Sequence, residues 1–178
     1  MSLRRFAAAA LLTLMVGAGT FTVPAVAADS GAKKLSTEER LKRLEDIESI
    51  RALLVAYGRN FDKRDFVAYS NLFAKEGTWT GGAENASSYK GPEAIRAFVE
   101  KIYPASVFPG SYHIMSSIDV KVDGKDSASA WSRWTYVVRG VRQEPVLYAG
   151  GWYEDTFIRE EGEWKFKSRR VLSDPVPK

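Results

Sequence analysis

The sequence contains no cysteine and a single histidine, His113. A chain without cysteine forms no disulfide bond, so its fold must rest on its hydrophobic core and its hydrogen bonds. Zinc sites usually take three or four nitrogen or sulfur ligands, which one histidine does not supply. We therefore expect no metal site, and no other cofactor is indicated.

Charge of either sign is also not concentrated in any part of the chain. The 26 lysine and arginine residues exceed the 22 acidic residues by four, and Arg4 and Arg5 supply half of that excess. Elsewhere the two signs alternate, as in REEGEWKFK at 159–167. A nucleic-acid-binding face needs clustered basic residues, so no nucleic-acid partner is expected. Glycine motifs of nucleotide-binding loops and nucleophile elbows are missing as well.

The first 28 residues have the pattern of an export signal. Arg4 and Arg5 precede an apolar run, and the segment ends in AVAA at 25–28. A charged start, an apolar stretch and small residues at the end are typical of a cleaved signal peptide. A membrane anchor is the alternative, although the run is short for a span. We expect cleavage after Ala27 or Ala28, a linker over 29–36, and a periplasmic or secreted domain over 37–178 without a membrane partner.

Three helices are predicted in the first half of this domain. Ile50, Leu54, Tyr57 and Phe61 recur at spacings of three and four, which predicts one apolar face on a long helix from about Thr37. The sequence TEER at 37–40 indicates its start. A second helix is expected over 66–74, followed by a short strand, EGTWTG. GPE at 91–93 opens a third helix, because proline is favoured in a first turn.

From residue 112 the pattern changes to strands. Four long segments, HIMSSIDVKV, SASAWSRWTYVV, YAGGWYEDTFIR and WKFKSRRVL, are separated mainly by short polar turns. Helices followed by hairpin-linked strands predict an α+β fold, with a curved antiparallel sheet wrapped around the N-terminal helices and enclosing a pocket. Gly150 and Gly151 in mid-strand favour a bend or bulge. Which face of each strand points inward is left open by the alternation.

Several segments together resemble a known family. They are IRALLVAYGRNFDKRDFVAYSNLFAKEGTW, YKGPEAIRAFV, YHIMSSIDVKVDGKDSASAWSRW and GGWYEDTFIREEGEWKFKSRRV. Their order and spacing resemble the SnoaL-like branch of the nuclear transport factor 2-like superfamily. The resemblance implies a cone-shaped α+β fold with a pocket in its mouth, and homodimers that pack through their sheets. That superfamily includes dehydratases, isomerases, polyketide cyclases and plain binding proteins, so the fold alone does not choose a function.

The dehydratases of this superfamily offer the nearest match for a site. They carry a tyrosine on the first helix, an aspartate at its end and a histidine on the first long strand. Tyr57, Asp62 and His113 stand at these positions, and we assign them as candidate catalytic residues. Two alternatives stay open. Asp62 could instead cap the next helix, a role that Asp65 could also fill, and His113 could be a buried structural residue.

Four further residues are candidates for binding a ligand. Tyr153, Trp134 and Tyr136 can present aromatic surface to a flat, apolar molecule, and Arg170 can bind a carboxylate. Asp155 is expected to pair across the sheet with an arginine such as Arg133 or Arg170.

These residues predict an exported protein that binds a small, mostly apolar ligand, such as a cyclic, polyketide-like or steroid-like molecule. As an enzyme it would be a cofactor-free dehydratase or isomerase that uses Asp62 and His113 for proton transfer. The alternatives are a non-catalytic binding or accessory protein and a dimeric structural module.

Overall fold

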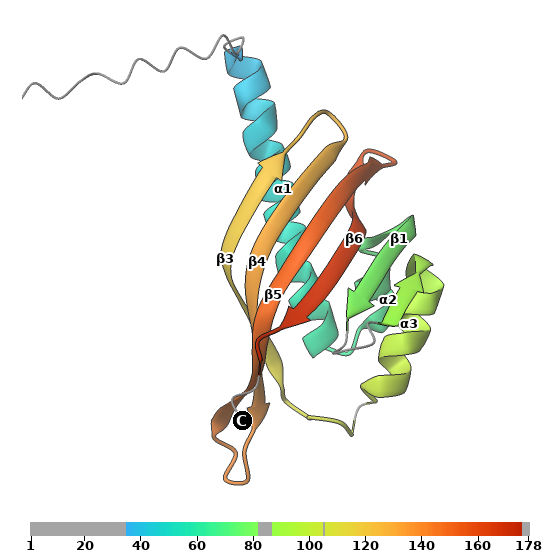
Figure 1. The fold of residues 1–178 in the computed structure, drawn as a ribbon, viewed down its shortest axis with the longest axis vertical. Helices are drawn as coiled ribbons and strands as arrows, with labels where there is room; N and C mark the ends of the chain where they lie inside the picture. Colours follow the sequence, from blue (N-terminus) through green and yellow to red (C-terminus); the bar gives the residue numbers. More distant parts are fainter. Residues whose placement is uncertain (1–34, 82–86, 105, 176–178) are drawn as a thin grey trace, which may run out of the picture. The chain divides into compact units, whose positions relative to one another are not determined.

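Three helices and one six-stranded sheet form the part of the chain that the structure describes, residues 35–81, 87–104 and 106–175 (Figure 1). The structure is a computed structural model, and these residues belong to one unit, Leu35–Lys178. In chain order the elements are α1 (Thr37–Asp62), α2 (Phe66–Ser70), β1 (Phe73–Gly81), β2 (Ser87–Lys90), α3 (Gly91–Ile102), β3 (Tyr112–Val122), β4 (Ser127–Arg139), β5 (Pro145–Glu160) and β6 (Glu163–Ser173).

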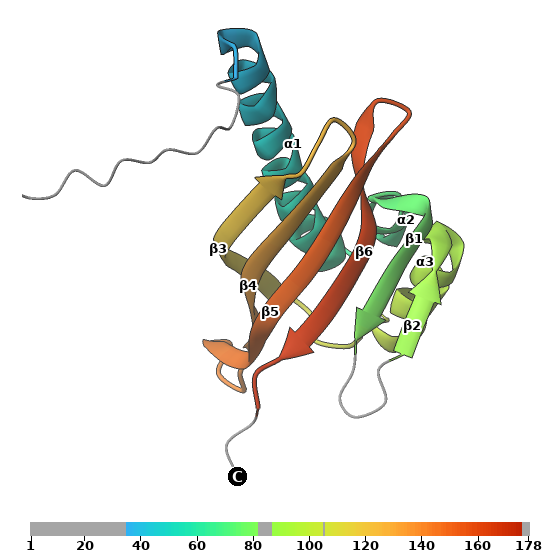
Figure 2. The same cartoon turned by 45° about the horizontal axis from the view of Figure 1, so that its top comes forward.

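The strands lie in the order β2-β1-β6-β5-β4-β3. Strands β3 to β6 are joined by hairpins and pair antiparallel, and the helices lie on one side of the curved sheet (Figure 2). The predicted α+β fold is therefore confirmed. The short strand β2 and the parallel pairing of β1 with β6 were not predicted. The predicted signal peptide and most of the predicted linker lie outside the described residues.

Helix α1 begins as a capping box. The Ser36 hydroxyl accepts from the Glu39 backbone N–H at 3.1 Å, and the Glu39 carboxylate accepts from the Ser36 N–H at 2.7 Å. Ser36, one residue before the predicted start, is therefore the N-cap. The predicted apolar face is confirmed, since Ile50, Leu54 and Tyr57 are buried. Residues 37–45 are exposed, and this end of the helix extends past the sheet (Figures 1 and 2).

Helix α2 ends earlier than predicted. Its N-cap is Asp65, whose carboxylate accepts from the Ala68 N–H at 2.9 Å. The prediction extended the helix to residue 74, but the Leu72 carbonyl accepts from the Phe166 N–H at 2.9 Å. Pairing with β6 thus draws Phe73 into β1, because tertiary contacts outweigh local helix propensity.

The inner face of the sheet is set by strand alternation. Tyr153 and Phe157 of β5 point into the core, and Trp134 of β4 does so as well. The predicted irregularity near the paired glycines is present, because the register of β4 and β5 shifts between Tyr136 and Val137. A Cβ on Gly151 would lie 2.0 Å from the Leu172 carbonyl oxygen, so only glycine fits here.

Candidate functional site

A cavity of about 270 Å³ lies between α1, α3 and the inner face of the sheet. Its wall contains Tyr57, His113, Trp134, Tyr136 and Tyr153, which are five of the seven side chains that the sequence analysis selected. These residues come from α1, β3, β4 and β5, so the fold gathers side chains that lie far apart in the sequence. The sequence left open which face of each strand points inward. For β3, the inward face is the one that carries His113.

The carboxylate of Asp62 binds His113 twice. Its Oδ2 accepts from the His113 backbone N–H at 2.9 Å, and its Oδ1 lies 2.7 Å from Nδ1 of the ring. An ionised carboxylate only accepts hydrogen bonds, so Nδ1 carries the hydrogen. In the neutral ring Nε2 is then an acceptor, and it has no hydrogen-bond partner among residues 35–81, 87–104 and 106–175. The open ring nitrogen belongs to a side chain that lines the cavity.

Local sequence explains why Asp62 is available for this contact. Asp65 caps α2, so the sequence alternative in which Asp62 is the cap is excluded. Asp62 is the last residue of α1, and it lies outside the cavity, in a surface groove that it shares with Arg59 and Lys63. The His113 ring stands between this groove and the cavity, since it borders both.

Helix α1 comes unusually close to β3 at Gly58. A Cβ built on Gly58 would lie 3.2 Å from the His113 Cβ and 3.9 Å from the Met115 Cγ. The absence of a side chain at this position lets the helix and the strand approach closely. Gly58 therefore helps to set the position of the His113 ring, a role that the sequence analysis did not assign.

The Tyr57 hydroxyl is oriented by an indole. Nε1 of Trp79 donates to it at 3.0 Å. One lone pair of the hydroxyl is thereby occupied, and this bond does not use the hydroxyl's own hydrogen. Trp79 also lines the cavity, together with Phe98 of α3, and the two rings lie 4.8 Å apart.

The floor of the cavity is aromatic. The rings of Trp134 and Tyr153 stack 5.9 Å apart, and the ring of Tyr136 lies 4.7 Å from that of His113. Burial raises the pKa of Tyr153 well above its ordinary value of 10.0, so its hydroxyl stays protonated at neutral pH. Such a surface suits a flat apolar ligand that also carries a hydrogen-bond acceptor.

Below this floor lies a buried ion pair, for which the sequence analysis named the aspartate but not the arginine. The Arg169 guanidinium donates to both carboxylate oxygens of Asp155 at 2.8 and 2.7 Å, and both side chains are fully buried. The guanidinium carbon lies 3.9 Å from the centre of the Tyr57 ring and 3.9 Å from that of Tyr153. Burial alone would lower the pKa of Arg169, but the Asp155 carboxylate raises it, so the arginine stays charged.

The structure corrects two expectations about arginines. Asp155 was expected to pair across the sheet with an arginine such as Arg133 or Arg170. The pairing with an arginine is confirmed, but both named candidates were wrong because the partner is Arg169. Arg170 lies on the outer face, where it is exposed and bonded to Glu154, so the structure does not bring it to the cavity. The alternation of side chains along the strands could have identified the partner. Asp155 lies two residues from Tyr153 and so shares its inward face, and Arg169 is the cross-strand partner of Asp155.

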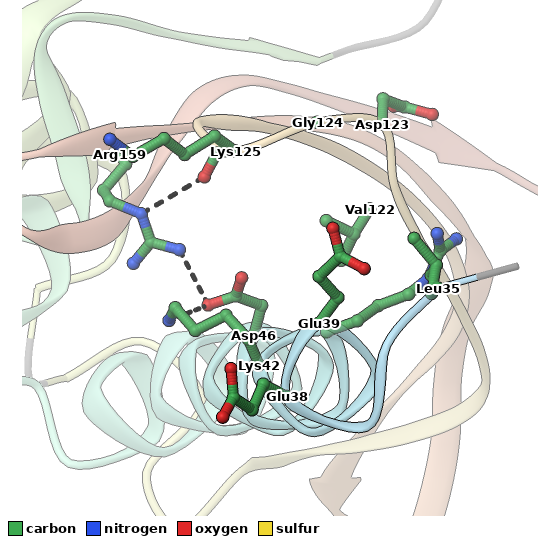
Figure 3. A pocket seen from close by; sticks show the side chains of 11 residues that line it. Leu35, Glu38, Glu39, Lys42, Asp46, Val122, Asp123, Gly124, Lys125 and Arg159 are labelled. Carbon is green, nitrogen blue, oxygen red and sulfur yellow. Dashed lines mark hydrogen bonds and ion pairs between the residues drawn. The ribbon is translucent and has the colours of Figure 1, made fainter. Parts of the chain in front are cut away.

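A larger hollow of about 840 Å³ lies at the other end of α1 (Figure 3). The buried carboxylate of Asp46, in its wall, is paired with two basic side chains. Oδ1 of Asp46 accepts from Lys42 at 2.8 Å, from Arg159 at 2.7 Å and from the indole of Trp164 at 3.2 Å. This cluster ties α1 to β5 and β6, which is a structural role. The described residues contain no group of three histidine, cysteine, aspartate or glutamate side chains placed to hold a metal ion.

The sequence profile of the SnoaL-like domain matches residues 42–170. The chain belongs to the SnoaL-like domain family. It is 27% identical over 135 residues to an uncharacterized protein of Mycobacterium tuberculosis. The aligned region covers 76% of this chain and 87% of the relative.

Solved structures agree with this assignment. A nuclear transport factor 2-like protein with a cystatin-like fold from Novosphingobium aromaticivorans is 27% identical, with a TM-score of 0.68, over 79% of this chain and 90% of that one. A candidate scytalone dehydratase from the same organism is 21% identical, with a TM-score of 0.66. The match covers 76% of this chain and 89% of that one. ActVI-ORFA of Streptomyces coelicolor is 19% identical, with a TM-score of 0.65. The match covers 72% of this chain and 97% of that one. The last two show the fold alone.

No helix in the described part of this SnoaL-like protein is long and apolar enough to cross a bilayer.

Proposed function

We propose that this SnoaL-like protein is a cofactor-independent lyase or isomerase that acts on a small, mostly apolar cyclic ligand. The observation that carries the proposal is the double hydrogen bond from His113 to Asp62, at 2.9 and 2.7 Å. A base must be held in one tautomer and one orientation to take a proton from a bound substrate. Asp62 supplies both constraints from behind the ring.

In the dehydratase form of the proposal, Nε2 of His113 removes a proton from the carbon beside a carbonyl group. The electron pair of that C–H bond forms an enolate, whose oxygen accepts from the Tyr57 hydroxyl. The imidazolium then returns its proton to a hydroxyl group on the next carbon. That C–O bond breaks, water leaves, and an unsaturated ketone and a neutral His113 remain. An isomerase would return the proton to another carbon instead.

The aromatic floor supports the proposed ligand class. Trp134, Tyr136 and Tyr153 offer ring surface to a flat molecule, and the cavity of about 270 Å³ limits its size. Arg169 has no direct role in proton transfer here, since it lies behind the two tyrosine rings and binds Asp155. We place it as a positioning residue for Tyr57 and Tyr153.

The test uses a panel of cyclic β-hydroxy ketones, whose dehydration is followed by the ultraviolet absorbance of the product. Loss of a general base typically costs about 10²- to 10⁴-fold in rate, and we expect this for His113→Gln and Asp62→Asn. Asp65→Asn is the matched control, because it makes the same change three residues away and asparagine remains a good N-cap. Equal rates for wild type and Asp62→Asn would reject the mechanism.

The alternative function is non-catalytic ligand binding. One observation favours it: Asp62 also accepts from the His113 backbone, so the pair could serve only to fasten α1 to β3. In that case the panel shows no turnover by the wild type. Displacement of a fluorescent apolar probe, anilinonaphthalene sulfonate, by panel members would still report binding, and Tyr153→Ala would weaken it.

We further propose that the protein is exported to the periplasm or secreted and that it forms a homodimer. The first proposal rests on the charged, apolar and small-residue segments of residues 1–28. In a Gram-negative host the mature protein should begin near Ala28 or Asp29 in the periplasmic fraction. The second rests on the outer face of the sheet, which none of the described helices covers (Figure 2) and where Trp131 is 40% exposed. A monomer mass in light scattering at high concentration would contradict it.

A further inference from the structure

Exposed apolar side chains lie on the β4–β5 hairpin and at the end of α3, and two of them also line the cavity. We call Ile102, Val141, Val146, Leu147 and Tyr148 the mouth rim. Their exposed fractions are 39%, 100%, 40%, 70% and 58%. Single exposed apolar residues are common on protein surfaces, but a group of them next to a pocket usually marks an interaction surface.

The mouth rim is continuous with the cavity. Ile102 and Tyr148 belong to both, since they also line its wall. The ring of Phe108, on the loop between α3 and β3, packs 4.7 Å from that of Tyr148. The other rim residues lie on the β4–β5 hairpin, which projects beyond the rest of the sheet (Figure 1). Through Ile102 and Tyr148, the exposed apolar surface therefore adjoins the cavity wall.

The hairpin also carries an excess of positive charge. Arg139 and Arg142 are exposed, and Glu144 is the only acidic residue between 139 and 148. The Glu144 carboxylate accepts from the Arg142 backbone N–H at 2.9 Å, and the Gly140 N–H donates to the Glu144 carbonyl at 2.8 Å, which closes the turn. Both guanidinium groups thus stand beside the apolar tip without a carboxylate partner in the described residues.

We propose that the mouth rim docks on a lipid bilayer with anionic headgroups, from which the cavity takes up its apolar ligand. Apolar side chains enter the boundary between headgroups and acyl chains, while arginines bind the headgroup phosphates. A second copy of this chain fits the rim less well, because two rims of like charge would face each other. The docking differs from the sequence-based expectation of no membrane partner. The uptake step rests on the proposed apolar ligand, whereas the docking itself does not depend on the proposed chemistry.

The chain has no cysteine, so one introduced cysteine carries one fluorescent label. Leu147→Cys places an environment-sensitive nitrobenzoxadiazole label on the rim. Leu44→Cys places the same label on the exposed end of α1 and is the matched control, since Leu44 is 63% exposed. Both are prepared from an exporting host with the same N-terminus. With vesicles that contain phosphatidylglycerol, the label at 147 should shift to the blue and the label at 44 should not.

Two variants separate the electrostatic from the hydrophobic contribution to membrane binding. In the labelled Leu147→Cys background, Arg142→Gln should weaken partitioning about fivefold, because one basic residue near an anionic surface contributes about 1 kcal/mol. Val141→Ser should weaken it on neutral and anionic vesicles alike. No blue shift at 147, or equal shifts at 147 and 44, would overturn the proposal. So would a shift that follows protein concentration without vesicles, since a second copy would then cover the rim.

Discussion

Nε1 of Trp79 donates a hydrogen bond to the hydroxyl of Tyr57 at 3.0 Å, across the wall of the cavity. Trp79 lies on β1 and Tyr57 on α1, so this contact joins an outer part of the sheet to the helix that carries the candidate site. It leaves the Tyr57 hydroxyl with its own hydrogen to donate, as the proposed enolate requires.

Trp79→Phe should reduce ligand binding as well as stability. The substitution keeps a ring against Phe98 but removes the N–H, and we expect the free energy of unfolding to fall by about 1 kcal/mol. Trp164→Phe is the control, because it removes an indole N–H that donates to Asp46 far from the cavity. Denaturant melts should show a loss for both variants. Titration with anilinonaphthalene sulfonate should show weaker binding for Trp79→Phe alone.

The two aspartates at the junction of α1 and α2, Asp62 and Asp65, should respond differently to truncation. Asp65→Ala removes the N-cap of α2 and should lower the free energy of unfolding by about 1 kcal/mol, without changing the His113 tautomer. Asp62→Ala should release the ring, so that the tautomer with hydrogen on Nδ1 no longer dominates. Nitrogen-15 NMR of the single histidine, with urea melts of both variants, checks this. An unchanged histidine spectrum in Asp62→Ala would contradict the assigned contact.

Much of the fold could be predicted because local patterns and tertiary structure agree in it. The spacing of Ile50, Leu54 and Tyr57 predicted the buried face of α1, and the alternating strands predicted the hairpins. Local patterns gave the wrong element where pairing between distant strands determines the structure. Phe73 follows an apolar helical run in sequence, but its pairing partner is Phe166 of β6, nearly a hundred residues away.

The candidate site could be predicted only in part, because local sequence identifies residue types but not the contacts that distant strands make. His113 and Asp62 stood out by residue type and position. Arg169 and Arg170 are neighbours in sequence, and the choice between them depends on which face of β6 points inward. That face is fixed by the register with β5, where Arg169 stands opposite Asp155. The role of Trp79 depends on a contact between α1 and β1, which no spacing in the sequence encodes.

The ion pair between Arg169 and Asp155 should be costly to break but replaceable. Arg169→Leu leaves a buried carboxylate without a partner and should lower the free energy of unfolding by about 3 to 5 kcal/mol. Asp155→Leu combined with Arg169→Leu should recover most of that loss, since two apolar residues avoid the cost of burying charge. Urea melts of the two single variants and the double variant measure the coupling. Additive losses would show that the pair contributes no specific interaction.

The Asp46 cluster should make stability depend on pH. Burial acts to raise the pKa of Asp46, but the hydrogen bonds from Lys42, Arg159 and Trp164 outweigh it and lower the pKa below the ordinary 3.8. A carboxylate whose pKa is lowered by folding stabilises the protein fully above its unfolded value. This contribution is lost as the pH falls through the lower, folded value.

Asp46→Asn should therefore reduce the free energy of unfolding by about 2 kcal/mol at neutral pH, and the difference from wild type should vanish as the pH falls below about 3.8. The control is Asp126→Asn, because Asp126 contacts the same Arg159 but its side chain is 55% exposed. An exposed ion pair contributes little, so this variant should follow the wild type at every pH. Urea melts over a pH series compare the three proteins. A difference between Asp46→Asn and wild type that stays constant into acid would mean that Asp46 acts through packing rather than through its charge.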